Sequence, residues 1–264
     1  MTTRAEQGMS AATMASKVPA VTAYFWVVKL LTTAGGESTA DWLAMEHFGL
    51  KAALLGTSVA LVLAVLVQLA TRRYVVIAYW TAVTLVGIAG TLITDSIVQV
   101  LGVSDLAATV LFAALLMALF ALWYRFEGTL SIQSITTRRR ELFYWATVMT
   151  TFALGTALGD LTAFALSWGF PRSIGLFAVA FVAAGIAHLR FGVDPVLCFW
   201  VAYVLTRPLG ATVADYLAFG PDVGALGFGL LPVSAVFLTA IVVLVTYLAV
   251  TGRDLPDRSG DSGR

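Results

Sequence analysis

Four aspartates recur at matching places in a strongly apolar chain, and their residue type could support cation or proton chemistry. Each aspartate lies fifteen residues after a tryptophan and five residues after a glycine. Carboxylates at one depth of a membrane protein attract cations, so the set could bind a metal or monovalent cation, or carry protons. Four ungapped copies of one pattern mark an internal repeat. The triples are Trp26/Gly36/Asp41, Trp80/Gly90/Asp95, Trp145/Gly155/Asp160 and Trp200/Gly210/Asp215.

Additional charged residues occur in the first and fourth copies. Lys29 and Glu37 lie three and eleven residues after Trp26, and Arg207 lies seven residues after Trp200. Helix positions 0, 3, 7, 11 and 15 fall within an arc of roughly 120°, so these side chains share a face with the tryptophan. Ionisable groups inside a bilayer face the bundle interior rather than lipid. In a ring the first and fourth copies are neighbours, which predicts an ion pair between Glu37 and Arg207.

The role of these charges remains open between two interpretations. The four aspartates could line a polar cavity that opens outward, or they could be four copies of one structural bond to a loop or helix end. The Glu37–Arg207 pair could likewise serve function or only fix packing. Pro208 follows Arg207 and should kink its helix, which makes this helix the best candidate for a broken or mobile element. We therefore expect Arg207, Lys29 and Pro208 to contribute gating or charge balance.

The composition indicates an integral membrane protein. Hydrophobic residues make up 59% of the chain and charged residues only 12%, whereas soluble domains carry about 25% charged residues. The mean hydropathy is +0.90. The single cysteine, Cys198, excludes an intramolecular disulfide and a cysteine-built metal site. The first seventeen residues lack a compact apolar core, so we expect no removable signal peptide.

The apolar segments predict an all-α fold. A membrane-spanning helix needs about 20 mostly apolar residues, and eight segments satisfy this: 20–43, 51–71, 76–99, 106–126, 142–164, 172–191, 196–218 and 227–250. They pair into four two-helix repeats that form one membrane domain. The expected divisions are an N-terminal tail 1–16, repeats 17–74, 75–135, 136–194 and 195–252, and a C-terminal tail 253–264.

Lysines and arginines predict the orientation of these helices. They gather between repeats, as in Arg72–Arg73 and Arg138–Arg140, and are sparse within repeats, at Lys51 and Arg172. The positive-inside rule then places both termini in the cytoplasm and each aspartate toward the outer side. Repeats of two helices all point the same way, so they are parallel repeats about an axis along the membrane normal. The first helices of the repeats should form an inner ring, with the more apolar second helices outside.

Several long stretches resemble a family of bacterial membrane-anchored proteins of unknown function that is built from this tandem two-helix repeat. The resemblance rests on KVPAVTAYFWVVKLLTTAGGESTADWL, EGTLSIQSITTRRRELFYW, ALGTALGD and FWVAYVLTRPLGATVADYL, and extends from residue 17 to about residue 252. It implies a multi-pass protein of the bacterial inner membrane. It implies no substrate.

The sequence favours membrane transport of a small solute, a cation or a solute coupled to protons. Asp41, Asp95, Asp160, Asp215 and Glu37 would bind the ion. The alternative is a non-transporting scaffold or sensor that binds a partner through its cytoplasmic loops. We expect no enzyme activity, no cofactor and no nucleic-acid partner, because the chain lacks a nucleotide-binding, nucleophile or metal-cluster motif. The lipid bilayer is the expected partner, and the oligomeric state stays open, a homo-oligomer included.

Overall fold

The computed structural model describes residues 16–255, and within that range the chain forms eight long α-helices and no strand. The expectations for the two polar tails therefore fall almost entirely outside the described residues. The helices are α2 (Ala23–Asp41), α3 (Leu50–Ala70), α4 (Val76–Asp95), α5 (Asp105–Glu127), α6 (Arg138–Asp160), α7 (Phe170–Phe191), α8 (Pro195–Ala218) and α9 (Leu230–Thr251).

Local sequence signals set the ends of these helices. Thr22, Thr137 and Asp194 each accept a hydrogen bond from a backbone N–H of the following first turn, which satisfies a donor that has no partner inside the helix. Gly128 ends α5 in the left-handed conformation that glycine adopts without strain. Gly192 and Gly252 end α7 and α9 in the same left-handed conformation.

Seven of the eight helices are long and apolar enough to cross a membrane. The exception is α2, which holds Lys29, Glu37 and Asp41 within nineteen residues. The expected set of eight apolar spans therefore needs a correction at α2. Its charged residues are all buried inside the protein, so its neighbours shield this helix from lipid.

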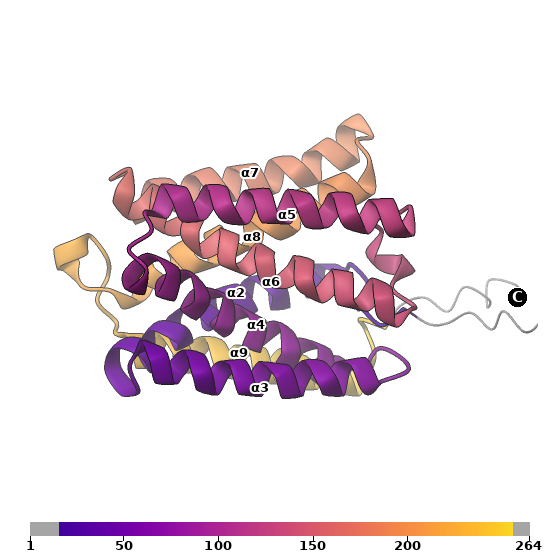
Figure 1. The fold of residues 1–264 in the computed structure, drawn as a ribbon, viewed down its shortest axis with the longest axis horizontal. Coiled ribbons are helices and arrows are strands. Elements are labelled where there is room, and N and C mark those ends of the chain that lie inside the picture. Colours follow the sequence, from indigo (N-terminus) through magenta and orange to yellow (C-terminus); the bar gives the residue numbers. More distant parts are fainter. Residues whose placement is uncertain (1–15, 256–264) are drawn as a thin grey trace, which may run out of the picture.

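The first helices of the repeats form a closed inner ring. α2 packs on α4, α4 on α6, α6 on α8, and α8 returns to α2. Each second helix packs mainly against the first helix of the next repeat: α3 on α4, α5 on α6, α7 on α8, and α9 on α2 (Figure 1). Because each repeat packs on the next and α9 packs on α2, the last repeat contacts the first. These contacts close the pseudo-fourfold ring that the repeats predict.

The repeated glycines let the inner helices approach closely. A Cβ atom added at any of them would lie 2.9 Å or less from an atom of the next inner helix, too close for a side chain. The contacted residue always lies seven positions after the tryptophan of the next copy. The pairs are Gly36 with Gly87, Gly90 with Phe152, Gly155 with Arg207, and Gly210 with Thr33.

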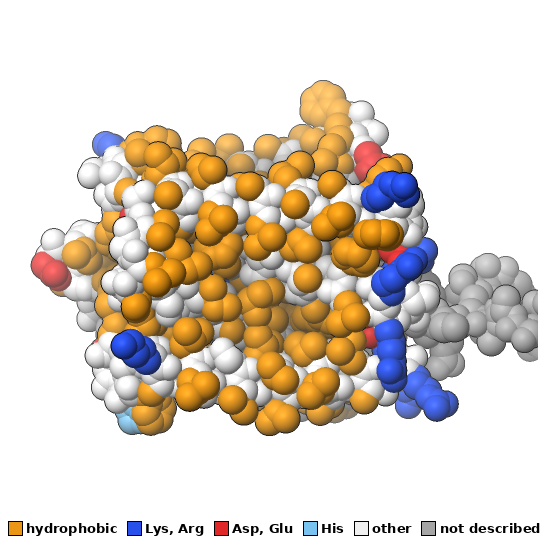
Figure 2. All heavy atoms as spheres, viewed as in Figure 1, with side chains coloured by type: hydrophobic (Ala, Val, Ile, Leu, Met, Phe, Trp, Pro, Cys, Tyr) orange, Lys and Arg blue, Asp and Glu red, His pale blue; other side chains and the backbone are white. Residues whose placement is uncertain are grey.

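The surface has the character expected of a membrane protein. Figure 2 shows hydrophobic side chains over the flank of the bundle, with lysines and arginines gathered at one end, on the right. The outer helices supply many of the exposed apolar side chains, such as Leu63 on α3, Met117 on α5 and Val242 on α9. We call the end that carries Arg72, Arg73 and Arg138–Arg140 the basic end, and the opposite end, where the repeated aspartates lie, the acidic end.

One expectation about a single residue changes with the structure. α8 runs without interruption through Pro208, so the expected break is absent. Pro208 Cδ packs close to Gly155 on α6. Trp80, Trp145 and Trp200 are buried, so these tryptophans pack inside the bundle.

Candidate functional site

The inner helices place their polar residues in layers along the ring axis. Successive layers are four residues apart in sequence, about 6 Å along a helix. Lys29 on α2 lies nearest the basic end, followed by Arg207 on α8, then Glu37 on α2, and finally the repeated aspartates. The charged residues selected from the sequence thus form an axial series rather than one cluster.

Arg207 is the centre of this series and contacts all three other inner helices. It donates to Glu37 Oε2 over 2.5 Å and to the Thr33 carbonyl over 2.9 Å, both on α2. On α6 it donates to Thr156 Oγ1 over 2.8 Å, and on α4 to the Thr91 hydroxyl. The expected ion pair is present, and Arg207 is fully buried. One guanidinium therefore links all four repeats.

Glu37 uses only one of its two carboxylate oxygens for this network. Arg207, Thr91 at 2.7 Å and Thr156 at 3.3 Å all donate to Oε2. Within residues 16–255, no protein donor reaches Oε1. Thr91 and Thr156 occupy the position of Glu37 in their own repeats, eleven residues after the tryptophan. This layer therefore holds Glu37 firmly while leaving one carboxylate oxygen available.

Three carboxylates meet on the acidic side of Arg207. Ligand atoms of Glu37, Asp41 and Asp215 all lie within 4.8 Å of one another, and the three residues are buried. Asp215 is only 5% exposed, and its Oδ1 atom has no hydrogen-bond partner in the described part of the chain. We call these three residues the carboxylate cluster. Its oxygens could hold a cation.

The other two repeated aspartates lie at the edge of this cluster. Asp95 and Asp160 are half-buried, and neither belongs to the close set of three. Both are nevertheless near enough for their charges to act on Asp41. The structure thus brings the first and fourth aspartates together with Glu37, and it places the second and third where solvent reaches.

Lys29 lies on the basic side of Arg207 in an aromatic setting. Its ammonium nitrogen is 3.9 Å from the centroid of the Phe152 ring and 4.3 Å from that of Tyr203. The residue is fully buried, and this nitrogen has no hydrogen-bond partner among the described residues. Cation–π attraction is the favourable contact that the structure shows for it.

Comparison with known protein families finds the same fourfold repeat along the chain. The family described as Repeat of Unknown Function (DUF347) matches the chain four times, over residues 24–74, 78–129, 143–193 and 198–254. The chain belongs to this family. Each match begins two residues before the tryptophan of its copy, so the four DUF347 repeats share the register of the aspartates. No curated protein and no solved structure matches the chain.

The basic end of the DUF347 ring is closed by the segment before the first repeat and by residues at the ends of the repeats. Lys17 donates to Glu141 Oε2 over 2.6 Å, and this pair is buried beside Gln68. Tyr74 donates to Asp254 near the C-terminal end of the described chain. Burial raises the pKa of the Tyr74 hydroxyl, and the carboxylate of Asp254 raises it further, so Tyr74 keeps its proton at physiological pH.

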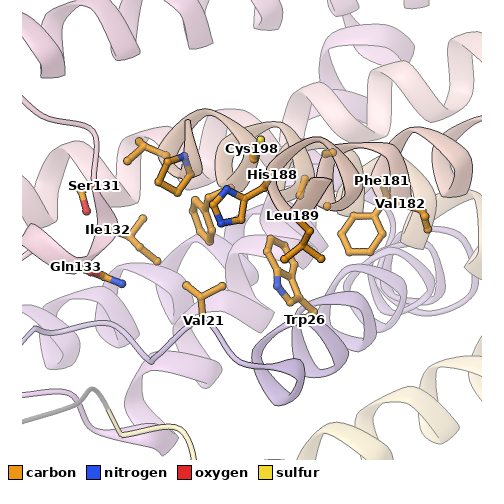
Figure 3. A pocket seen from close by; sticks show the side chains of 16 residues that line it. Val21, Trp26, Ser131, Ile132, Gln133, Phe181, Val182, His188, Leu189 and Cys198 are labelled. Carbon is orange, nitrogen blue, oxygen red and sulfur yellow. The ribbon is translucent and has the colours of Figure 1, made fainter. Parts of the chain in front are cut away.

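Two pockets lie on the flanks of the bundle, away from the charge network. One, of about 620 Å³, lies between the start of α2, the C-terminal half of α7, the start of α8 and the loop around Gln133. Figure 3 shows Trp26, Phe181 and His188 lining this pocket. The other, of about 690 Å³, lies between α5 and α8. Neither is lined by Arg207 or by a residue of the carboxylate cluster. Neither histidine belongs to the carboxylate cluster: His188 lines the first pocket and His47 stacks on Trp42.

Sequence reasoning missed one shared feature of this site. In the first three repeats the α-helix gives way to a π-helical turn directly after Asp41, Asp95 and Asp160. π-helical turns are rare in proteins, and those that do occur are often found at functional sites. In the fourth repeat α8 continues as an α-helix beyond Asp215 to Ala218. The repeated aspartates mark where these turns begin, but no residue type shared by the three turns predicts the π-helical conformation.

Proposed function

We propose that this protein transports a small cation across the membrane, with the carboxylate cluster as its binding site. The carrying observation is the buried set of Glu37, Asp41 and Asp215, with an unpartnered oxygen on Asp215, beside a fully buried Arg207. Ionisable residues at this depth of a membrane bundle are costly and mark ion pathways or proton relays. Both uses suit a cation carrier, including one that exchanges its cation for protons.

The burial pattern supports a carrier rather than an open pore. Half-buried Asp95 and Asp160 lie at the acidic end, whereas Arg207 and Lys29 are fully buried on the axis. A cation could thus approach the cluster from the acidic end while the Arg207 layer blocks the way onward. Transport then requires the hydrogen bonds of Arg207 to rearrange.

The same proposal includes a location and an orientation. The gathering of lysines and arginines at one end supports a bacterial inner-membrane protein whose basic end faces the cytoplasm. Lys17 and Asp254 both lie at this end, beside Glu141 and Tyr74. The carboxylate cluster would then open toward the outer side.

The alternative, a scaffold that binds a partner through its basic loops, receives less support. Arg139 and Arg140 both bind Glu127 within the chain, Arg140 over 2.7 Å. Two of the three arginines in the first turn of α6 are therefore already paired. The proposal involves no catalytic step.

Flux measurements in proteoliposomes test this proposal. Protein reconstituted into vesicles should move at least one ion from a panel of monovalent cations, divalent cations and protons. Asp41→Asn and Asp215→Asn should abolish most of this flux. Asp95→Asn and Asp160→Asn are matched controls, since they make the same change at equivalent repeat positions outside the cluster, and should retain most of it. Equal effects of all four variants would exclude the cluster as the transport site.

A further inference from the structure

We infer that the carboxylate cluster binds one divalent cation of the oxygen-preferring class, such as Mg²⁺ or Mn²⁺. This inference rests on the proposed function for its biological meaning, but it concerns equilibrium binding and can be tested without transport. It depends on the charges, the ligand atoms and the spacing of Glu37, Asp41 and Asp215.

The charge balance favours two positive charges. Arg207 donates to Glu37 through a 2.5 Å ion pair, so these two residues offset one another. Asp41 and Asp215 are buried beside this pair, and the hydrogen bonds of the described chain give neither carboxylate a cationic partner. A buried carboxylate must be paired, bound to a cation or protonated. When both aspartates are ionised, one divalent ion would neutralise them, whereas one monovalent ion would leave a buried negative charge.

The ligand atoms select the chemical class of the ion. All three residues of the cluster offer carboxylate oxygens, and no histidine or cysteine belongs to it. Hard divalent cations such as Mg²⁺, Mn²⁺ and Ca²⁺ prefer oxygen ligands, whereas zinc and copper favour nitrogen and sulfur. A softer transition metal would therefore be a poor match for this site.

The spacing of the oxygens suits a single ion. The three ligand atoms lie within 4.8 Å of one another, and oxygens at opposite sides of a Mg²⁺ or Ca²⁺ ion lie about 4 to 5 Å apart. Asp215 Oδ1 is buried and has no hydrogen-bond partner in residues 16–255. Glu37 Oε1 is likewise left free by the donors that bind Oε2. The cluster thus presents oxygens without donors from the described chain, and one of them, Asp215 Oδ1, is fully buried.

Titration of the purified full-length protein with Mn²⁺ tests the inference, with electron paramagnetic resonance reporting the free ion. We expect one saturable site in wild-type protein, and Mg²⁺ should compete for it. Asp215→Asn and Asp41→Asn should weaken Mn²⁺ binding by at least about tenfold, since even an outer-sphere partner contributes that much to a metal site. Asp95→Asn and Asp160→Asn should weaken binding less than either cluster variant, because their carboxylates lie outside the set of ligand atoms. Gel filtration and thermal unfolding establish that each variant is folded.

The outcomes separate this inference from the transport proposal. Selective loss of Mn²⁺ binding in the cluster variants supports the site, even if vesicles show no flux. Absence of saturable binding in folded wild-type protein would overturn it, and so would equal binding in all four variants. Displacement of Mn²⁺ by Na⁺ at the same concentrations as by Mg²⁺ would also overturn it. In those cases flux of a monovalent ion or of protons could still support transport.

Discussion

The side chain of Arg207 passes over Gly155 in the space that any other residue would fill. A Cβ atom on Gly155 would lie 2.2 Å from Arg207 Cγ and 2.5 Å from its Cβ. The same glycine faces Pro208 Cδ. The repeated glycine of the third repeat is therefore what admits the long side chain of the fourth to the ring axis, where it meets Glu37.

This contact predicts that Gly155→Ala will disturb the charge network. The added methyl group must push Arg207 aside, and overpacking of this kind costs about 1–3 kcal/mol or more. Thermal unfolding in detergent should show a clearly lower midpoint. Gly175→Ala on α7 is the matched control, since its Cβ would meet nothing within 4 Å, and it should leave the midpoint unchanged or higher. Equal midpoints for the two variants would contradict the steric account.

The Glu37–Arg207 pair predicts strongly non-additive mutations. Glu37→Gln or Arg207→Met alone leaves one buried charge unpaired, which costs about 3–5 kcal/mol. The two changes together should recover most of the lost stability, because no uncompensated charge remains. Unfolding midpoints and yields of monodisperse protein measure the effect. Additive losses would show that the two charges do not stabilise one another. Loss of flux in a well-folded double variant would show that the pair also serves transport.

Lys29 predicts a variant that gains stability. Its ammonium is fully buried without a hydrogen bond, and an unsatisfied buried polar group costs about 1–3 kcal/mol. Lys29→Met keeps the length of the side chain and its contacts with Phe152 and Tyr203, so the unfolding midpoint should rise. Lys51→Met, at an exposed position, controls for the loss of one positive charge. A lower midpoint in Lys29→Met would mean that the cation–π contacts outweigh burial.

The closure of the basic end predicts a pH-independent effect of Tyr74. The folded protein raises the pKa of Tyr74 above its usual value near 10. Its contribution to stability is therefore complete below about pH 10 and is lost only as pH rises through the folded pKa. Tyr74→Phe should lower stability by about 1–3 kcal/mol, because Asp254 loses its donor, and by the same amount at pH 6 and pH 9. Tyr124→Phe, at an exposed position, is the control. A loss that shrinks between these pH values would contradict the raised pKa.

Much of the ring was predictable because the repeat is ungapped. The fixed spacing of tryptophan, glycine and aspartate places equivalent side chains at equal depths on four parallel helices. Adjacency of the first and fourth copies in a ring then brings Glu37 to Arg207. The repeated glycine of each inner helix lies at its contact with the next copy.

The remaining features depend on three-dimensional contacts that spacing cannot encode. Four equivalent aspartates suggested one symmetric group, yet only Asp41 and Asp215 join Glu37, because the first and fourth repeats alone carry the extra charges that break the symmetry. The packing of outer helices on the next repeat was not predicted, since an apolar helix face does not specify its partner. The continuity of α8 through Pro208, and the packing of its ring on Gly155, were likewise not predictable from the spacing.

The central claim, that the carboxylate cluster carries a cation across the membrane, is tested most directly by comparing ion flux through Asp215→Asn and Asp160→Asn in the same vesicle preparation. The two variants make the same chemical change at equivalent repeat positions, but only Asp215 belongs to the cluster. We predict that wild type and Asp160→Asn transport at similar rates, and that Asp215→Asn is slower by at least about tenfold, equivalent to about 1.4 kcal/mol. Equal rates for the two variants, or wild-type flux no greater than that of protein-free vesicles for every ion, would contradict the account.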